Sequence, residues 1–242
     1  MANILKACLL ITIVLLSSCA VTPVRNPIAE WSPSQNFDQR KPRLIVIHAT
    51  EMQSAEAALA VLKSQNSAGR VSAHYLIADT GKIFQLVDDQ QRAWHAGAGR
   101  WRGLNDLNSV SIGIELDNDG TEAFQANQIQ ALITLLNDLC IRWDIPRTAI
   151  IGHADLAPTR KSDPSVLFPW QTLAQAGFGV WFSQPLSEPP ESFDAVLGLR
   201  ALGYDTRDLP AAVRAFHRHF RGMESDGLDE VDRMILFDLL KQ

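Results

Sequence analysis

The stretch Leu44-Ile-Val-Ile47, closed by His48, is a short β-branched run that predicts a buried strand. The next segment, Ser54 to Gln65, is rich in Ala and Leu and begins with a serine suited to the N-cap position, so it predicts a helix. Because a strand is followed directly by a helix here, the pattern favours a sheet with helices packed against it.

Further strands of this sheet are predicted along the chain. The runs 73–78 and 82–87 alternate around a Gly-containing turn, which is typical of a β-hairpin. Two later strands are predicted at 110–116 and 148–152. Between them, apolar residues recur at three- and four-residue steps and predict one face of a long helix: Ile129, Leu132, Ile133, Leu136, Leu139, Cys140 and Trp143. We therefore expect an α/β domain over 43–183, with a mixed β-sheet flanked by helices.

A small C-terminal three-helix domain is predicted beyond the Pro-rich linker 184–190. It covers 191–242 and contains three helical stretches: 192–202, 209–220 and 229–240. Gly203 stands where a helix C-cap is expected. His217 and His219 lie two positions apart on the middle helix, so they cannot face one metal ion together. We interpret both as polar surface residues.

The N-terminus has the parts of a secretory signal peptide. Lys6 precedes an apolar run over 7–16 that is too short to cross a bilayer core, which needs about 20 residues. Leu16-Ser-Ser-Cys19 then resembles a bacterial lipobox, which implies a signal peptide over 1–18 and acyl chains on Cys19. Plain secretion is the alternative reading.

The residue after Cys19 is Ala20 rather than Asp, which in lipoproteins of this type implies the outer membrane. The expected location is therefore the periplasmic face of the outer membrane, through a lipid anchor at Cys19. Residues 19–42 contain four prolines and no periodicity, so we predict a tether or a surface-wrapping segment.

Composition excludes several classes of protein. The 22 Lys+Arg and 27 Asp+Glu give a net charge of -5 and a pI near 5.7, so nucleic acid is not an expected partner. With 46% hydrophobic and 20% charged residues the whole chain is not disordered. Three cysteines cannot form a disulfide framework, and Cys140 on its apolar helix face is expected to be buried.

Three side chains that can bind a metal close predicted strands or follow them: His48, His153 and Asp163. Two imidazoles and one carboxylate leave the fourth position of a tetrahedral Zn²⁺ open for water, as in a catalytic zinc site. Taken singly, each histidine also fits a hydrogen-bonded surface residue, and the aspartate before Pro164 also fits the start of a turn. Spacing alone does not decide between these readings.

The sequence motifs around these residues distinguish metal ligands from surface or turn residues. The motifs are Ile151-Gly-His-Ala-Asp155, Arg160-Lys-Ser-Asp-Pro164, Phe168-Pro-Trp170, Ser72-Ala-His-Tyr75, Ala93-Trp-His-Ala-Gly97 and Ser111-Ile-Gly-Ile-Glu115. Over about 43–170 the chain resembles the type-2 N-acetylmuramoyl-L-alanine amidase family, which shares its fold with the peptidoglycan recognition proteins. The resemblance implies zinc as the cofactor, with three ligands in this sequence: His48, His153 and Asp163.

The same resemblance implies roles for the neighbouring residues. Glu115 matches the catalytic glutamate that shuttles a proton between water and the leaving amine, and Lys161 matches the lysine that stabilises the oxyanion. The expected substrate-binding residues are His74, Trp94, His95, Asn108 and Arg160. For His95 a loop brace is the alternative, Asn105 and Asn108 would also pin the loop before the catalytic strand, and Arg160 would meet a peptide carboxylate.

The implied function is zinc-dependent hydrolysis of the amide between N-acetylmuramic acid and L-alanine in peptidoglycan or muropeptides. The expected partners are that substrate and a membrane, the latter through Cys19. Two alternatives are a non-catalytic peptidoglycan-recognition module and a wall-anchoring lipoprotein, since the C-terminal helices resemble a peptidoglycan-binding-like domain. The presence of all five reactive residues favours the enzyme: His48, Glu115, His153, Lys161 and Asp163.

Overall fold

The computed structural model describes residues 25–39, 42–64 and 69–242. The predicted signal peptide 1–18 and Cys19 lie outside these residues. Within the described ranges, no helix is both long enough and apolar enough to cross a membrane.

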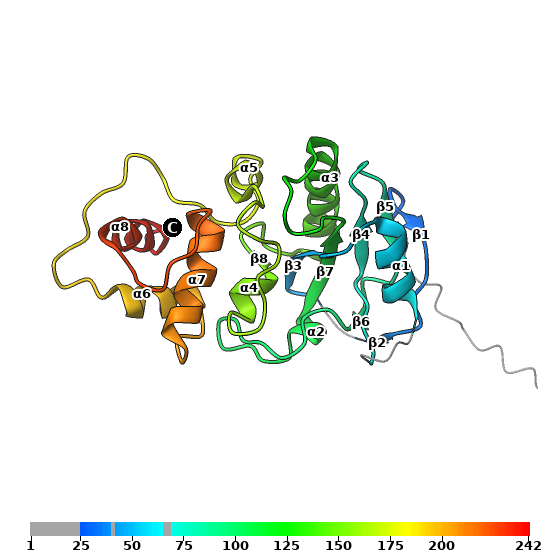
Figure 1. Cartoon of the computed structure of the whole chain (residues 1–242), viewed down its shortest axis with the longest axis horizontal. Helices are drawn as coiled ribbons and strands as arrows, with labels where there is room; N and C mark the ends of the chain where they lie inside the picture. Colours follow the sequence, from blue (N-terminus) through cyan, green and yellow to red (C-terminus); the bar gives the residue numbers. More distant parts are fainter. Residues whose placement is uncertain (1–24, 40–41, 65–68) are drawn as a thin grey trace, which may run out of the picture.

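A six-stranded mixed sheet forms the centre of the molecule (Figure 1). Its strand order is β1-β5-β4-β7-β3-β8. The strands are β1 (Glu30–Trp31), β3 (Leu44–Ala49), β4 (Tyr75–Ile77), β5 (Ile83–Gln85), β7 (Ser111–Leu116) and β8 (Ile150–Gly152). Strand β3 is parallel to both β7 and β8, whereas β4 and β5 form the predicted antiparallel hairpin. The predicted fold class is confirmed.

The long helix α3 (Ala126–Trp143) covers one face of this sheet. Side chains of β3 alternate between the two faces. Ile45 and Ile47 pack in the same cluster as Leu132 and Leu136 of α3, and the predicted burial of Cys140 on this helix is confirmed. By the same alternation His48 belongs to the opposite face, together with Val46.

Helix α1 (Ala55–Lys63) covers part of that opposite face, where Ala58 and Leu62 pack with Leu76 of β4. Ser54 caps α1 as predicted, because its side chain accepts a hydrogen bond from the Ala57 N–H. The short helices α2 (Leu107–Val110), α4 (His153–Leu156) and α5 (Trp170–Gln175) complete this domain. The site described below lies between α1 and α4.

Residues 25–39, which belong to the predicted tether 19–42, are part of the folded domain rather than a free tether. Strand β1 pairs with β5, and β2 (Phe37–Gln39) pairs with β6 (Gln91–Ala93) in a second, two-stranded sheet. The Asn26 side chain, buried, donates a hydrogen bond to Asp138 of α3. The segment therefore wraps the surface, because its short extended pieces satisfy their backbone groups on the edges of existing strands.

The predicted three C-terminal helices are α6 (Ala195–Leu202), α7 (Leu209–Phe220) and α8 (Glu230–Leu239). Gly203 ends α6 as expected, with a φ of 137°. The helices lie at one end of the molecule, against α4 and α5 (Figure 1).

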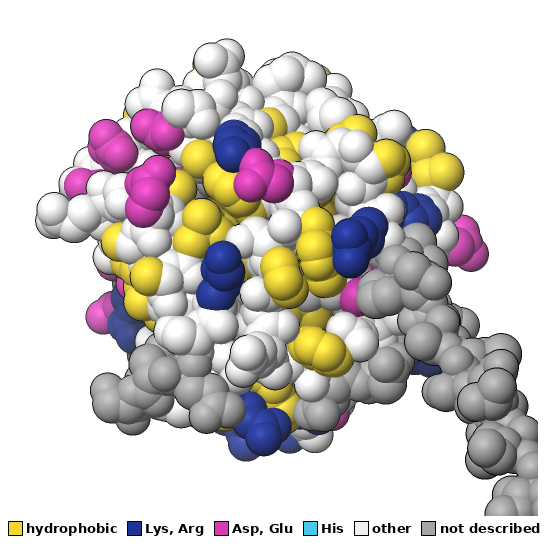
Figure 2. Space-filling view, turned by 90° about the vertical axis from the view of Figure 1, so that its right-hand side faces the viewer, with side chains coloured by type: hydrophobic (Ala, Val, Ile, Leu, Met, Phe, Trp, Pro, Cys, Tyr) yellow, Lys and Arg dark blue, Asp and Glu magenta, His cyan; other side chains and the backbone are white. Residues whose placement is uncertain are grey.

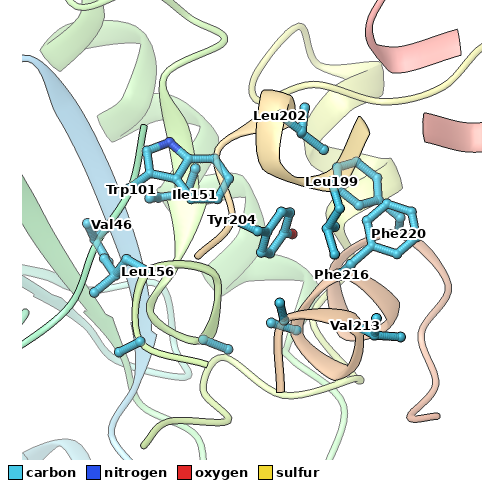
Figure 3. Close-up of a cluster of buried hydrophobic side chains, with 14 of the residues drawn as sticks. Val46, Trp101, Ile151, Leu156, Leu199, Leu202, Tyr204, Val213, Phe216 and Phe220 are labelled. Atoms are coloured by element: carbon cyan, nitrogen blue, oxygen red, sulfur yellow. The ribbon is translucent and has the colours of Figure 1, made fainter. Parts of the chain in front are cut away.

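These helices share one apolar core with the sheet domain. Figure 3 shows Val46 and Leu156 on one side of this core, with Tyr204, Phe216 and Phe220 on the other. The two parts of the chain therefore pack directly against each other through buried apolar side chains.

All six histidines of the chain are buried. Figure 2 shows the opposite end of the molecule, where α1 and β1 lie, and no histidine of the described residues is visible there. The interpretation of His217 and His219 as polar surface residues is therefore wrong: their exposed fractions are 1% and 5%. Helix α7 is covered on two sides, by its own domain and by the sheet domain, so each ring meets a buried carboxylate: Asp232 for His217 and Asp155 for His219.

Candidate metal centre

The two histidines of the predicted metal site lie at the carboxyl ends of neighbouring parallel strands. His48 is the penultimate residue of β3, and His153 begins α4 directly after β8. Since β3 and β8 pair in parallel, their carboxyl ends meet at one edge of the sheet, where ligands commonly bind.

Asp163 reaches the same place from a loop rather than from a strand end. Beyond α4 the chain turns back, with the N–H groups of Arg160 and Lys161 both donating to the Ala157 carbonyl. The Ala154 N–H then donates to the Asp163 carbonyl at 2.9 Å, which holds the loop against α4. The turn thus brings a carboxylate ten residues away in the sequence beside His153.

Three ligand atoms converge at this point. His48 Nδ1 lies 3.0 Å from His153 Nδ1, and Asp163 Oδ2 lies 3.2 and 3.1 Å from these two nitrogens. All three side chains are buried, and together they form a group that can hold a metal ion. Around a tetrahedral zinc with bonds of about 2.0–2.1 Å, ligand atoms lie about 3.3 Å apart. The triangle observed here fits that ion.

The Nε2 atoms of His48 and His153, which point away from the three converging ligand atoms, also have hydrogen-bond partners. His48 Nε2 lies 3.0 Å from His95 Nδ1, and His95 Nε2 lies 3.2 Å from Ser111 Oγ. His153 Nε2 lies 3.0 Å from the Ala96 carbonyl. Such contacts fix the orientation of a ligand ring, and metal-binding histidines almost always have them.

The loop that carries His95 and Ala96 is held from two sides. Asn108 Oδ1 accepts hydrogen bonds from both of their backbone N–H groups, at 3.0 and 2.8 Å. Arg160 Nη2 donates to the carbonyls of Ala96 and Ala98, at 2.7 and 2.8 Å. Both residues therefore support the loop beside the metal site, and Asn108, which was predicted to bind substrate, is not among the residues that line the cavity.

Gly113 of β7 explains how His95 comes so close to the sheet. A Cβ atom at this position would lie 2.3 Å from Cγ of the His95 ring, closer than real Cβ atoms approach other heavy atoms. The glycine in the sequence Ser111-Ile-Gly-Ile-Glu115 is thus required by the close approach of a ring that itself contacts His48.

Burial and mutual charge set the protonation of the cluster. Burial, followed by the neighbouring His153, lowers the pKa of His48 to about 4, against the opposing influence of Asp163. Burial alone would raise the pKa of Asp163, but hydrogen bonds from His153 and His48 outweigh it and hold the pKa well below its usual range. At neutral pH the cluster thus offers a neutral imidazole and a carboxylate, the forms that bind metal.

Glu115 lies beside the cluster on β7, where it is paired in register with His48 of β3. Burial, followed by the negative charge of Asp163, raises its pKa to about 8. Among the described residues, its buried Oε2 atom has no hydrogen-bond partner. The carboxyl group is therefore poised to accept or donate a proton near neutral pH.

Lys161 lies at the mouth of the same site, 35% exposed, with Nζ 3.9 Å from Asp163 Oδ1. A cavity of about 310 Å³ opens in front of the cluster and is lined by all five predicted reactive residues. Trp94, His95 and Arg160 also line it. His74 does not line this cavity: its Nδ1 accepts a hydrogen bond from the Gly113 N–H, and Nε2 lies 2.9 Å from the Gln91 carbonyl.

Sequence reasoning missed the far wall of the cavity. Met52, Val61 and Leu62 line it, and Arg70 lies at its edge with the guanidinium 5.9 Å from the centre of the Trp94 ring. Val61 and Leu62 of α1 carry no chemical signal in the sequence, because such apolar residues serve any packed helix face.

Comparison with known proteins agrees with this geometry. The family model described as N-acetylmuramoyl-L-alanine amidase matches residues 38–166. The chain is 36% identical over 230 residues to the N-acetylmuramoyl-L-alanine amidase AmiD of Escherichia coli (strain K12), with 82% of each chain covered. It is 43% identical over 101 residues to the 1,6-anhydro-N-acetylmuramyl-L-alanine amidase AmpD of Citrobacter freundii, which covers 42% of this chain and 54% of that one.

Two solved structures extend the match to the helical domain. The first is AmiD of E. coli in complex with the substrate anhydro-N-acetylmuramic acid-L-Ala-D-gamma-Glu-L-Lys, with a TM-score of 0.73, 36% identity and coverage of 83% of this chain and 90% of that one. The second is AmpDh3 of Pseudomonas aeruginosa in complex with anhydromuramic pentapeptide, with a TM-score of 0.71, 29% identity and coverage of 94% and 98%. The family model matches more than half of the chain and the relative at 36% identity covers 82% of it, so the chain belongs to the N-acetylmuramoyl-L-alanine amidase family.

Proposed function

We propose that this chain is a zinc-dependent amidase that hydrolyses the bond between the lactyl group of N-acetylmuramic acid and L-alanine. The observation that carries this proposal is the triangle of buried ligand atoms on His48, His153 and Asp163, with the Glu115 carboxyl group beside it. Zinc, when bound there, supplies a Lewis acid that polarises a carbonyl group and lowers the pKa of water.

Glu115 transfers the proton from the attacking water to the leaving amine. Its carboxylate takes a proton from the attacking water as the new C–O bond forms, and it returns the proton to the amine as the C–N bond breaks. Burial and the neighbouring Asp163 carboxylate raise the pKa of Glu115 above its usual value, which favours the protonated form that the second half of this exchange requires.

Lys161 and the cavity wall position the substrate. The ammonium group stabilises the negative charge that develops on the carbonyl oxygen during attack. Trp94 and the apolar side chains of α1 offer surfaces for the sugar and for the methyl groups of the lactyl-alanine unit. The substrate-bound structures of AmiD and AmpDh3 support muropeptides, including anhydro-muropeptides, as the substrate class.

The test compares substrates and metal content directly. The protein is incubated with anhydro-muropeptides and, separately, with intact sacculi, and the products are weighed by mass spectrometry with and without a chelator. We expect free stem peptide and peptide-free sugar in the untreated sample and neither after chelation, with activity restored by Zn²⁺. Release of peptide at an undiminished rate from protein shown to be metal-free would contradict the proposal.

We also propose that the enzyme is anchored by acyl chains on Cys19 to the periplasmic face of the outer membrane. The support is in the sequence, where Leu16-Ser-Ser-Cys19 follows a short apolar run and precedes Ala20. At that location the enzyme would meet wall fragments and the outer layer of the wall.

A further inference from the structure

A buried carboxylate joins the C-terminal helices to the metal site. Asp155 of α4 is only 2% exposed. Its Oδ1 accepts a hydrogen bond from the Tyr204 hydroxyl at 2.7 Å, and its Oδ2 lies 2.7 Å from His219 Nδ1. Tyr204 and His219 both belong to the helical domain 191–242, whereas Asp155 belongs to the catalytic domain.

Asp155 also contacts the turn between β8 and α4, directly before the metal ligand His153. Its Oδ2 also accepts a hydrogen bond from the Gly152 N–H at 2.7 Å, across the junction where β8 ends and His153 begins α4. This carboxylate thus has three donors, two of which come from the helical domain. A buried carboxylate is stable only where such donors satisfy it.

The same junction also contacts the second half of the metal site. A Cβ atom on Gly152 would lie 3.0 Å from Cδ of Pro164, the residue after Asp163, and 3.1 Å from the Trp170 ring. The His219 ring stacks on Trp170, with centroids 3.8 Å apart and planes 11° apart. A shift of the His219 ring would therefore displace the turn before His153 and the loop that carries Asp163.

We propose that Tyr204 and His219 are positioning residues of the metal site, which hold His153 in its metal-binding orientation through Asp155. The helical domain is thus an integral part of the metal centre, in addition to any contact it makes with the wall. This inference rests on the proposed function, since it requires that His48, His153 and Asp163 bind zinc.

The chain provides a matched control on the same helix. His217 is also buried in α7 and also contacts a buried carboxylate, with Nε2 2.8 Å from Asp232 Oδ2. That partner belongs to α8, so the contact stays within the helical domain. Loss of the His217 side chain should lower the free energy of unfolding by about as much as loss of His219. It should leave the affinity of the metal site for zinc unchanged.

The experiment measures zinc affinity of the full chain by competition with a chromophoric chelator. In His219→Phe the ring and its stacking remain but the donor to Asp155 is lost, and we expect the zinc dissociation constant to rise about tenfold. Tyr204→Phe, which removes only the hydroxyl, should weaken zinc in the same direction. His217→Phe should stay within about twofold of the wild type at a similar fall in melting temperature.

A conservative variant separates positioning from packing. In His219→Asn the side-chain amide places a donor near the position of Nδ1, so zinc affinity should be closer to the wild type than in His219→Phe, although the stacking is lost. If His219→Phe does not fold by circular dichroism, Tyr204→Phe alone decides.

The outcomes are distinct. Equal zinc affinity in the wild type, Tyr204→Phe and His219→Phe would overturn the inference and leave the proposed function intact. An equal loss of affinity in His217→Phe and His219→Phe would also overturn it, because general destabilisation would then explain both. A wild type that binds no zinc would overturn the proposed function together with the inference.

Discussion

Glu115 is the residue whose chemistry is easiest to isolate, because its amide analogue has almost the same shape. Glu115→Gln should retain zinc, since the residue is not among the three converging ligands. It should lower kcat by about a hundredfold or more, because the amide cannot accept the proton of the attacking water. Metal analysis and product formation on the same sample check both parts. Normal turnover with normal metal content would assign the base to another group.

The raised pKa of Glu115 also predicts how stability depends on pH in the metal-free protein. The pKa is about 8 in the folded state against 4.5 for the free side chain, so between these values the folded state binds more protons than the unfolded state. This residue's contribution to stability is therefore lost progressively as the pH rises from about 4.5 to 8.

The variant Glu115→Gln lacks that dependence. Its free energy of unfolding, relative to the wild type, should increase as the pH rises toward 8, by at most about 1.4 kcal/mol per pH unit, and then level off. Denaturant unfolding of both metal-free proteins at several pH values gives this difference directly. Other titrating groups, including His48, are shared by the two proteins and cancel in the comparison. A difference that does not change with pH would show that the carboxyl group titrates normally.

At the scale of an element, one side chain, that of Asn108, accepts hydrogen bonds from two successive backbone N–H groups of the loop that begins at His95. Asn108→Ala leaves the buried N–H groups of His95 and Ala96 without their acceptor, which costs about 1–3 kcal/mol for each unsatisfied group. We expect a lower free energy of unfolding and weaker zinc binding, since the Ala96 carbonyl also contacts His153.

The control is Asn105→Ala, three residues earlier and exposed, which should change the free energy of unfolding by less than about 0.5 kcal/mol. Chemical denaturation with and without zinc measures both effects. If the two variants were equally stable, Asn108 would not be what holds the loop.

The elements that the sequence predicts correctly are those whose own apolar pattern matches their burial. Helix α3 has regular apolar spacing that marks its one buried face, whereas strand β3 is a continuous apolar run and is buried on both faces. Helix α7 shows the limit of this reasoning, because eight of its residues are buried and the side that carries His219 packs on another domain. Periodicity along one segment contains no information about a second layer, so the buried role of both histidines could not be read from it.

In the candidate site, too, some features could be predicted from local sequence, and others depend on contacts between distant segments. Residues that carry chemistry in recognisable motifs, such as His48 and Glu115, could be named from the sequence. The contact between His48 and His95 could not, because it depends on the space above Gly113 and on the loop held by Asn108. The sequence thus identifies the groups that react, but it does not identify the contacts that hold these groups in place.

At the scale of the whole molecule, the domains are coupled by their shared core. Trp101 of the catalytic domain packs edge to face on Tyr204, with ring centroids 5.1 Å apart, and Tyr204 in turn lies 6.3 Å from Phe216. Aromatic contacts of this kind add to the stability gained from burial alone. The linker 184–190 is therefore a connection between packed parts, and the helices cannot swing away without opening apolar surface.

The proposed membrane anchor depends on one residue, Cys19. Stable anchoring requires more buried methylene groups than one acyl chain provides, at about 0.8 kcal/mol each, and a multiply acylated N-terminal cysteine meets that requirement. Because Asn26 already hydrogen-bonds to Gln85 and Asp138 of the catalytic domain, a lipid on Cys19 would be at most seven residues, about 25 Å of extended chain, from the enzyme.

We predict that the wild-type protein pellets with the outer membrane, whereas Cys19→Ser loses its lipid and is found soluble in the periplasm or held only by an uncleaved signal peptide. The substitution should leave the melting temperature of the catalytic domain unchanged, since the described contacts of that domain begin at Arg25. Membrane fractionation, with mass spectrometry of the N-terminal peptide, checks the location and the lipid together. A soluble wild type whose N-terminus follows Ala20 would reject the anchor and leave the amidase unaffected, because the described residues that line the metal site lie between His48 and Asp163.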